Sequence, residues 1–141
     1  MSARTKLEGQ IESGGFEFAL SLGAALTVHT ALGPGLLESV YECCLEHELR
    51  LRGIRVERQV VVGLDYRGKL LGDGFRIDLL VEGELVVEVK AVETLRPIHE
   101  AQLLTYLRLS GSRLGLLLNF NTESLREGIR RRVNGYPSSS T

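Results

Sequence analysis

The segment Leu85-Val86-Val87-Glu88-Val89-Lys90-Ala91 places two charged residues in an otherwise apolar and largely β-branched run. This composition predicts a buried strand of the core. Because side chains alternate across a strand, Glu88 and Lys90 share one face, while Val87 and Val89 share the other. Charged groups on a buried strand are unfavourable unless they are paired or used. The segment therefore predicts a candidate site as well as a strand.

A second strand is predicted over residues 75–81, and Glu82-Gly83-Glu84 between the two runs indicates a polar turn. In a hairpin centred on that glycine, Asp78 and Glu88 lie directly opposite each other. Opposed carboxylates with Cβ atoms ~5 Å apart repel, and a hard divalent cation removes the repulsion by taking both as ligands. We therefore interpret Asp78 and Glu88 as metal ligands. Two alternatives remain open: a register shift by one residue, which would put the acids on opposite faces, and an exposed acidic hairpin without metal.

Length and charge limit the classes of protein that the chain can belong to. Its 141 residues, 43% of them hydrophobic, are enough for one domain with a proper core. The 17 basic and 18 acidic residues give a formal net charge of -1, so any binding of a polyanion must depend on a local patch. No apolar stretch is expected to reach the ~18 residues that span a bilayer, and the first ten residues lack a signal core. We expect a cytoplasmic protein without a membrane partner.

Cysteines and histidines give no sign of a zinc site. Cys43 and Cys44 are adjacent in a predicted helix, which favours buried, reduced thiols over a disulfide or zinc ligands. His29, His47 and His99 are far apart in the sequence and form no zinc-binding pair. His29 falls at the edge of the apolar face of its helix, where a hydrogen-bonded core histidine is expected.

Hydrophobic periodicity predicts the remaining elements. Helices are expected over residues 15–32, 36–52 and 98–109, with a last helix beginning at Asn121 or Thr122. Further strands are expected over residues 55–66, 69–71 and 113–120. This order predicts an α/β fold in which a central mixed four-stranded sheet is flanked by helices. We expect one domain over residues 15–135, a loosely held N-terminus over 1–14 and a flexible, serine-rich tail over 136–141.

The densest basic cluster falls in the predicted last helix and consists of Arg126, Arg130, Arg131 and Arg132. Basic residues near the end of a helix complement its dipole, which is the role favoured by this pattern. Contact with phosphate groups is the alternative.

Four short motifs occur in a defined order. Gly35-Leu36-Leu37-Glu38-Ser39-Val40-Tyr41 matches GxxExxY, and it is followed by Ile77-Asp78, by Glu88-Val89-Lys90 and by the QxxxY element Gln102 to Tyr106. With these motifs the chain resembles the GxxExxY family of the PD-(D/E)xK nuclease superfamily, over residues 24–135. Ile77 stands where the superfamily name has proline, which only shapes the turn before the acid.

The resemblance implies a restriction-endonuclease-like core in αβββαβ order, with an extra helix at each end. It also implies a nuclease that uses Mg²⁺ or Mn²⁺ to hydrolyse phosphodiester bonds of DNA or RNA. A catalytically silent nuclease-fold module that binds nucleic acid or acts within a complex is the alternative. A homodimer is left open, because a small nuclease domain commonly needs a second copy to cut both strands.

Carried over to this chain, the resemblance implies a role for each motif residue. Asp78 and Glu88 are the metal ligands, and Glu38 on the first core helix helps to hold the metal or its water. Lys90 lies next to the attacking water, where it is expected to act as a charged group rather than as a base. The residues expected to support the site or contact the substrate are Tyr41, His99, Gln102 and Tyr106.

Overall fold

A five-stranded mixed sheet in the order β1-β2-β3-β4-β5 forms the centre of the computed structural model, which describes residues 15–135. The predicted N-terminal segment 1–14 and tail 136–141 lie outside the described residues. The strands are β1 (Val56–Tyr66), β2 (Lys69–Val81), β3 (Leu85–Lys90), β4 (Leu114–Asn119) and β5 (Ile129–Val133). Only β3 and β4 pair in parallel; the other neighbours are antiparallel.

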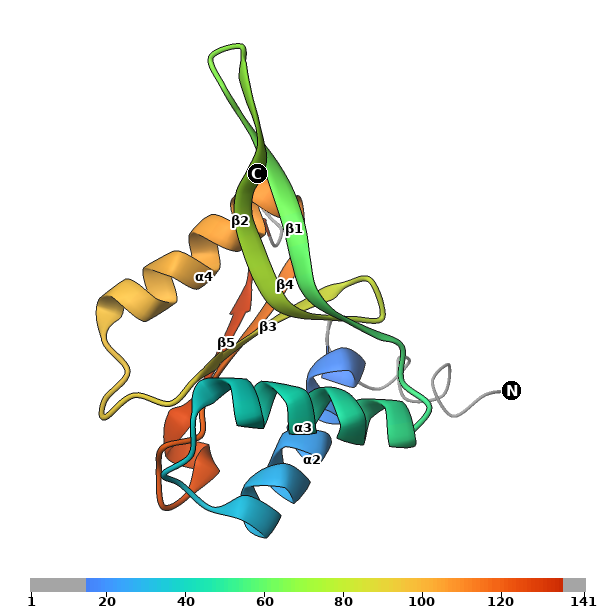
Figure 1. The fold of residues 1–141 in the computed structure, drawn as a ribbon, viewed down its shortest axis with the longest axis vertical. Helices are drawn as coiled ribbons and strands as arrows, with labels where there is room; N and C mark the ends of the chain where they lie inside the picture. The colour runs from blue at the N-terminus through green and yellow to red at the C-terminus, as the bar shows by residue number, and fades with distance from the viewer. Residues whose placement is uncertain (1–14, 136–141) are drawn as a thin grey trace.

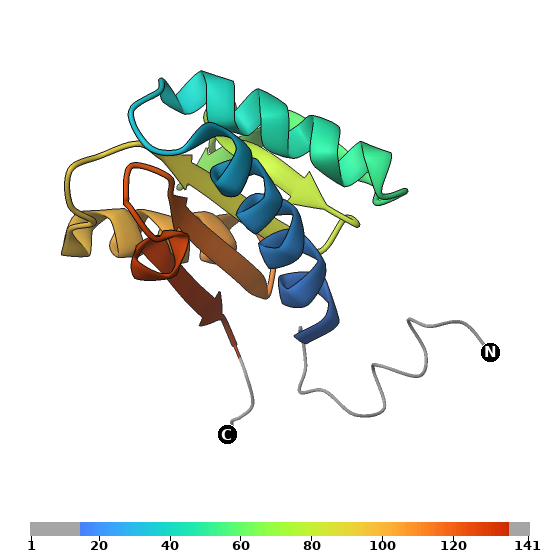
Figure 2. The ribbon, with the colours of Figure 1, turned by 90° about the horizontal axis from the view of Figure 1, so that it is seen from below.

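Helices cover both faces of the sheet. Helices α2 (Gly15–Leu32) and α3 (Glu38–Leu51) lie on one face, and α4 (Pro97–Ser110), which connects β3 to β4, lies on the other (Figures 1 and 2). The parallel pair β3 and β4 needs such a crossover. Each face has its own hydrophobic cluster, one built around Phe18, Tyr41 and Leu45, the other around Leu103 and Leu107. The predicted α/β architecture is confirmed.

The two central strands are apolar because both of their faces are covered. Every residue of β4 is buried, and β3 is buried up to Val89. Val87 and Val89 pack in the cluster under α2 and α3, whereas Val86 packs against α4. The alternation predicted for this strand is therefore confirmed, and Glu88 belongs to the α4 face.

The predicted C-terminal helix is wrong. A short 3-10 turn, η1 (Leu125–Gly128), is followed by β5, which adds a fifth strand beside β4. Ile129 and Val133 pack against the cluster under α2 and α3. Pairing with β4 and burial of these two side chains outweigh any local helical preference of the segment.

The strands predicted over residues 69–71 and 75–81 are confirmed, but the break expected between them is wrong, because β2 is continuous over 13 residues. With β1 it forms a long antiparallel hairpin, whose outer part, residues 63–74, projects beyond the body of the protein (Figure 1). We call this part the arm. Its predicted turn at Arg67 and Gly68 is confirmed, and both residues have positive φ, of 49° and 92°.

Helix α2 is long and apolar enough, by length and composition, to cross a membrane. This corrects the expectation that no stretch of the chain reaches that length. Phe18, Ala25 and Val28 of this helix are buried in the cluster beneath it. His29 is buried as well, and its Nε2 forms a hydrogen bond of 2.8 Å with the carbonyl oxygen of Thr122, as expected for a core histidine.

The two cysteines are free, which confirms that they form no disulfide with each other. Their predicted burial is wrong, since Cys43 is exposed and Cys44 is half-buried. Both lie in the middle of α3, where successive residues point in directions ~100° apart, so only one of the two can approach the core.

Candidate functional site

Asp78 and Glu88 meet where β2 separates from β3. The two strands have the predicted register, but their ladder ends at the pair Leu79 and Val87, one step before the acids. Beyond this pair, side-chain carboxylates replace main-chain carbonyls as hydrogen-bond acceptors. The Asp78 N–H donates to Glu88 Oε2 over 3.0 Å, and the Val89 N–H donates to Asp78 Oδ2 over 2.8 Å. The alternative of a shifted register is wrong, and the two acids lie side by side.

Burial makes this carboxyl pair hard to ionise. It raises the pKa of Asp78 to about 6 and that of Glu88 to about 8, and the charge of Asp78 contributes further to the rise at Glu88. Hydrogen bonds from the backbone and the charge of Lys90 oppose both rises without cancelling them. The pair therefore favours a bound proton or another cation near neutral pH.

Helix α4 supplies two polar groups to the same place. The Lys90 ammonium group donates to Gln102 Oε1 over 3.0 Å. One helical turn later, the Tyr106 ring stacks on Phe75 with 4.3 Å between the ring centroids. Burial, and then the charges of Glu88 and Asp78, raise the pKa of the Tyr106 hydroxyl. Lys90, Gln102 and Tyr106 are thus gathered around the two acids, as predicted.

Glu38 reaches the same edge of the sheet from α3. Its Oε2 accepts a hydrogen bond of 3.2 Å from the N–H of Ala91, the residue after Lys90, and its charge raises the pKa of Asp78. Within residues 15–135, no three histidine, cysteine, aspartate or glutamate side chains gather closely enough to form a ligand set. Glu38 as a further metal ligand stays a prediction.

Tyr41 explains the spacing of the GxxExxY motif. Its side chain is fully buried, and its hydroxyl donates to the Gly33 carbonyl oxygen over 2.6 Å and accepts from the Leu36 N–H over 3.0 Å. Gly35 in the same loop has φ 104°, a conformation that side-chain-bearing residues rarely adopt. Gly35 and Tyr41 therefore fix the loop from which Glu38 begins α3. The support that Tyr41 gives to the site is indirect.

Replacing Tyr41 by Phe is expected to lower the free energy of unfolding by about 1–2 kcal/mol, because the Gly33 carbonyl and the Leu36 N–H lose their partner in two part-buried hydrogen bonds. Urea denaturation followed by circular dichroism measures the change. Tyr66, which is 64% exposed, provides the matched control, and Tyr66→Phe should leave stability within about 0.5 kcal/mol of wild type. Equal effects of the two substitutions would contradict this role of Tyr41.

His99 has a structural contact of its own. Its Nδ1 accepts a hydrogen bond of 2.9 Å from the Arg96 N–H, and its backbone N–H donates to the Arg96 carbonyl oxygen. These bonds close the first turn of α4, which begins at Pro97. His99 thus helps to fix the start of the helix that carries Gln102, and its contact with substrate stays a prediction.

Glu42 is a buried acid that the sequence analysis missed. It accepts hydrogen bonds from Arg58 Nε over 2.6 Å and from Gln59 Nε2 over 2.7 Å, and its charge raises the pKa of both Asp78 and Glu88. Residues four apart share one face of a helix. The spacing from Glu38 to Glu42 is the signal that could have identified it.

Gln59 bends β1 beside the acids. The pairs Arg58 with Leu79 and Val60 with Ile77 place Gln59 opposite Asp78. Its φ of 55° is rare for a residue with a side chain. Through this bend, two consecutive residues of β1 reach the same carboxylate of Glu42, although strand alternation would otherwise direct them to opposite faces.

Replacing Glu42 by Gln is expected to reduce stability by about 1–2 kcal/mol at pH 7, because the Arg58 guanidinium loses its charged partner in a half-buried position. Thermal unfolding measures the change. Glu46→Gln is the matched control on the same helix: Glu46 pairs with Arg50, which is more exposed, and its loss should cost less than about 0.5 kcal/mol. If Glu46→Gln destabilised the protein as much as Glu42→Gln does, the stabilising role of the Glu42–Arg58 pair would be refuted.

The basic cluster is engaged within the protein. Arg130 and Arg132 both pair with Glu100 of α4, the former over 3.6 Å, while the Arg131 guanidinium lies 4.6 Å from the ring centroid of Phe18 in α2. Alternate residues of β5 therefore contact opposite helical layers. The expected pairing with the dipole of a C-terminal helix is wrong, because Arg130, Arg131 and Arg132 lie on β5 and Arg126 lies in η1.

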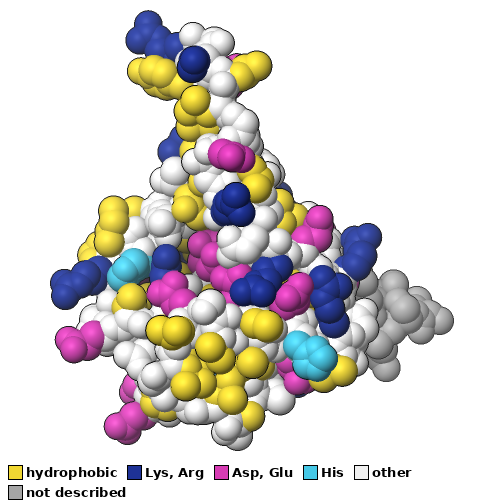
Figure 3. Space-filling view, in the orientation of Figure 1, with side chains coloured by type: hydrophobic (Ala, Val, Ile, Leu, Met, Phe, Trp, Pro, Cys, Tyr) yellow, Lys and Arg dark blue, Asp and Glu magenta, His cyan; other side chains and the backbone are white. Residues whose placement is uncertain are grey.

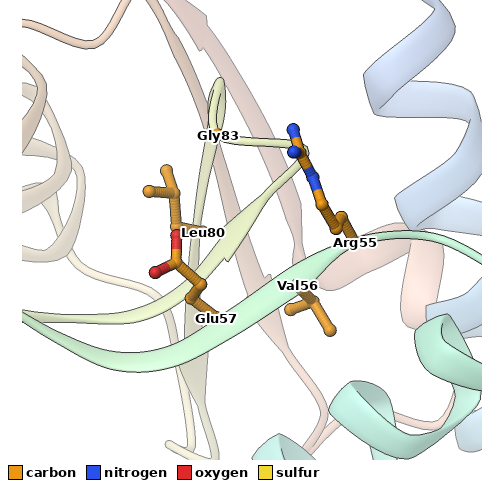
Figure 4. A pocket seen from close by; sticks show the side chains of 5 residues that line it. All are labelled: Arg55, Val56, Glu57, Leu80 and Gly83. Atoms are coloured by element: carbon orange, nitrogen blue, oxygen red, sulfur yellow. The ribbon is translucent and has the colours of Figure 1, made fainter.

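A pocket of about 350 Å³ lies next to the β2–β3 turn, away from the end of the ladder. It is lined by Arg55, Val56, Glu57, Leu80 and Gly83, and its two charged side chains do not converge (Figure 4). None of these residues belongs to the candidate site. On the molecular surface, acidic side chains gather instead between α3 and the foot of the arm, with basic side chains around them (Figure 3).

The fold and the site define a restriction-endonuclease-like α/β protein in which a half-buried aspartate and a buried glutamate lie side by side near a lysine. The model of the PD-(D/E)XK nuclease superfamily matches residues 18–132. The chain belongs to the PD-(D/E)XK nuclease superfamily. No curated protein and no solved structure gives a significant match.

Proposed function

We propose that this protein is a metal-dependent nuclease that hydrolyses phosphodiester bonds of DNA or RNA. The observation that carries the proposal is the convergence of Asp78 and Glu88 from facing strands, with Lys90 beside them. Membership of a nuclease superfamily whose enzymes generally use divalent metals supports it. From the motif around Glu38 and Tyr41, we further infer that the chain falls in the GxxExxY branch.

The acidic pair fits a hard divalent cation such as Mg²⁺ or Mn²⁺ in its donor chemistry. One oxygen of each carboxylate is used by a backbone N–H, and within the described residues Asp78 Oδ1 and Glu88 Oε1 accept no hydrogen bond. Two carboxylate oxygens, completed by water and substrate phosphate, are a typical Mg²⁺ environment. Burial raises the pKa of both acids, and a bound cation would stabilise their charged forms.

When bound, the cation would polarise a phosphoryl oxygen and acidify a water molecule for in-line attack. Lys90, held by Gln102, carries a fixed positive charge beside the acids, where it can offset the charge that develops on the phosphoryl group. Tyr106, which stacks on Phe75 and lies close enough to the acids for their charges to raise its pKa, can orient the substrate strand. Glu38 can hold a water molecule of the metal at the end of β3.

Incubation of the full chain with single- and double-stranded DNA and RNA tests the proposal. We expect cleavage of at least one substrate at low salt with Mg²⁺ or Mn²⁺, and none with EDTA. Absence of cleavage with all four substrates and both metals would overturn the proposal. Nucleic-acid binding that is unchanged by Asp78→Ala and never followed by cleavage would instead support a silent binding module.

A further inference from the structure

The two edges of the sheet differ in how they are protected. The edge strand β5 carries three consecutive arginines, which are a common means of keeping a strand edge from pairing with another chain. The opposite edge strand, β1, has the run Val60-Val61-Val62-Gly63-Leu64 at its centre, without a charge or a proline. Among the described residues no strand pairs with the outer edge of β1. An uncharged, β-branched edge of this kind is a template for strand addition.

The outer end of this run and the arm that continues from it are also poorly covered by their own chain. Val61, Tyr66, Leu70 and Leu71 are exposed apolar residues, with 43%, 64%, 75% and 42% of their surface accessible. A two-stranded hairpin is at best marginally stable in water, and additional strands stabilise it. The charges of the arm, Asp65, Arg67, Lys69 and Asp73, cancel. An apolar, neutral arm fits a protein strand better than it fits a polyanion.

We propose that the occupant of this edge is a second copy of the chain, whose β1 pairs antiparallel with this β1 about a two-fold axis at Val62. In this register Val60 lies opposite the partner's Leu64, and Val62 lies opposite its own equivalent. Val60 and Val62 both pack toward α4 in the monomer. The two copies would therefore join their apolar α4 faces into one continuous surface across a ten-stranded sheet.

Charge complementarity selects this register over its neighbour. With the axis at Val62, Glu57 near the start of β1 faces Arg67 in the turn just beyond the end of the partner's β1, and the same pair forms a second time by symmetry. With the axis at Val61 instead, Glu57 would lie opposite the partner's Asp65, which places like charges together twice. The extra residues of the hairpin bulge, between the pairs at Val62 and Leu64, lie on β2, so the central run of β1 stays regular beyond the bend at Gln59.

Light scattering coupled to size exclusion should find twice the chain mass of 15.6 kDa at micromolar concentration. Val61→Lys places a charge on the edge strand, as natural edge strands do to prevent pairing with another chain. It should raise the dissociation constant of the dimer by at least about tenfold. Leu51→Lys, at a site on α3 that is 68% exposed, is the matched control and should leave the dimer intact. A monomeric wild type, or a dimer that Val61→Lys leaves unchanged, would overturn the proposal.

Disulfide trapping tests the register in a background that lacks Cys43 and Cys44. Val62→Cys should form a covalent dimer on mild oxidation, because a self-paired position brings its two Cβ atoms within disulfide range. Val61→Cys should not, since its equivalent is displaced by two residues along the partner strand. The opposite pattern would reject the axis at Val62. The nuclease proposal does not depend on these outcomes, because every residue of its acidic pair comes from one chain.

Discussion

Replacing Asp78 by Asn, or Glu88 by Gln, is expected to lower the metal-dependent cleavage rate by at least about a thousandfold. A metal ion contributes several kcal/mol of transition-state stabilisation, and about 4 kcal/mol corresponds to a factor of a thousand in rate. Each substitution replaces one charged ligand with a neutral amide of the same shape. Initial rates on a fluorescent oligonucleotide and titration with Mn²⁺ measure the two consequences, loss of turnover and loss of metal affinity.

The Asn and Gln variants are expected to keep the fold, so a lower cleavage rate reflects the loss of a charged ligand and not unfolding. The side-chain carbonyl of Asn or Gln can still accept the hydrogen bonds from the Val89 and Asp78 N–H groups. Asp73→Asn, at an exposed position of the same strand, is the control and should retain wild-type activity. An Asp78→Asn protein that cleaves at the wild-type rate would remove these acids from the mechanism.

The metal-free protein is expected to lose stability as the pH rises from about 4 to about 8. The pKa of Asp78 rises from 3.8 to about 6 in the folded protein, and that of Glu88 rises from 4.5 to about 8. Because the folded state holds these protons more tightly than the unfolded state, their stabilising effect is complete below pH 4 and lost above pH 8. One pKa unit corresponds to ~1.4 kcal/mol, so the combined effect of the two acids amounts to several kcal/mol.

Glu88→Gln isolates this effect, since it removes the carboxyl group with the larger rise in pKa. At pH 8 without metal, the variant should be more stable than wild type by about 2 kcal/mol, and the difference should vanish near pH 4. Urea denaturation at several pH values measures it, with Asp73→Asn as the exposed control. Mn²⁺ should reverse the order by stabilising only the wild type. A difference that does not change with pH would contradict this account.

The elements predicted correctly are those whose pattern depends on near neighbours in the sequence. The register of the β2–β3 hairpin follows from the glycine in its turn, and helix α2 spans the predicted residues 15–32. β5 was missed because its identity depends on distant partners. Its arginines bind Glu100 of α4 and Phe18 of α2, and its backbone pairs with β4. No local periodicity in Arg130-Arg131-Arg132 carries that information.

The same division holds for the site. Asp78, Glu88 and Lys90 could be placed together from strand geometry alone, and the resemblance added Gln102 and Tyr106 of α4. Glu42 could not be recognised in this way, because its partners Arg58 and Gln59 come from β1 and are brought to α3 only by the bend at Gln59. Tyr41 was recognised from its motif, yet its two hydrogen bonds show that it fixes a loop.

The exchange of main-chain for side-chain hydrogen bonds at the end of the β2–β3 ladder also constrains how the sequence can evolve. A descendant that no longer needed hydrolysis would still have to satisfy the amide protons of Asp78 and Val89. Asparagine and glutamine can do this, whereas alanine cannot. Inactive descendants of this chain should therefore carry asparagine or glutamine at positions 78 and 88, which would keep the local hydrogen bonds after the activity is lost.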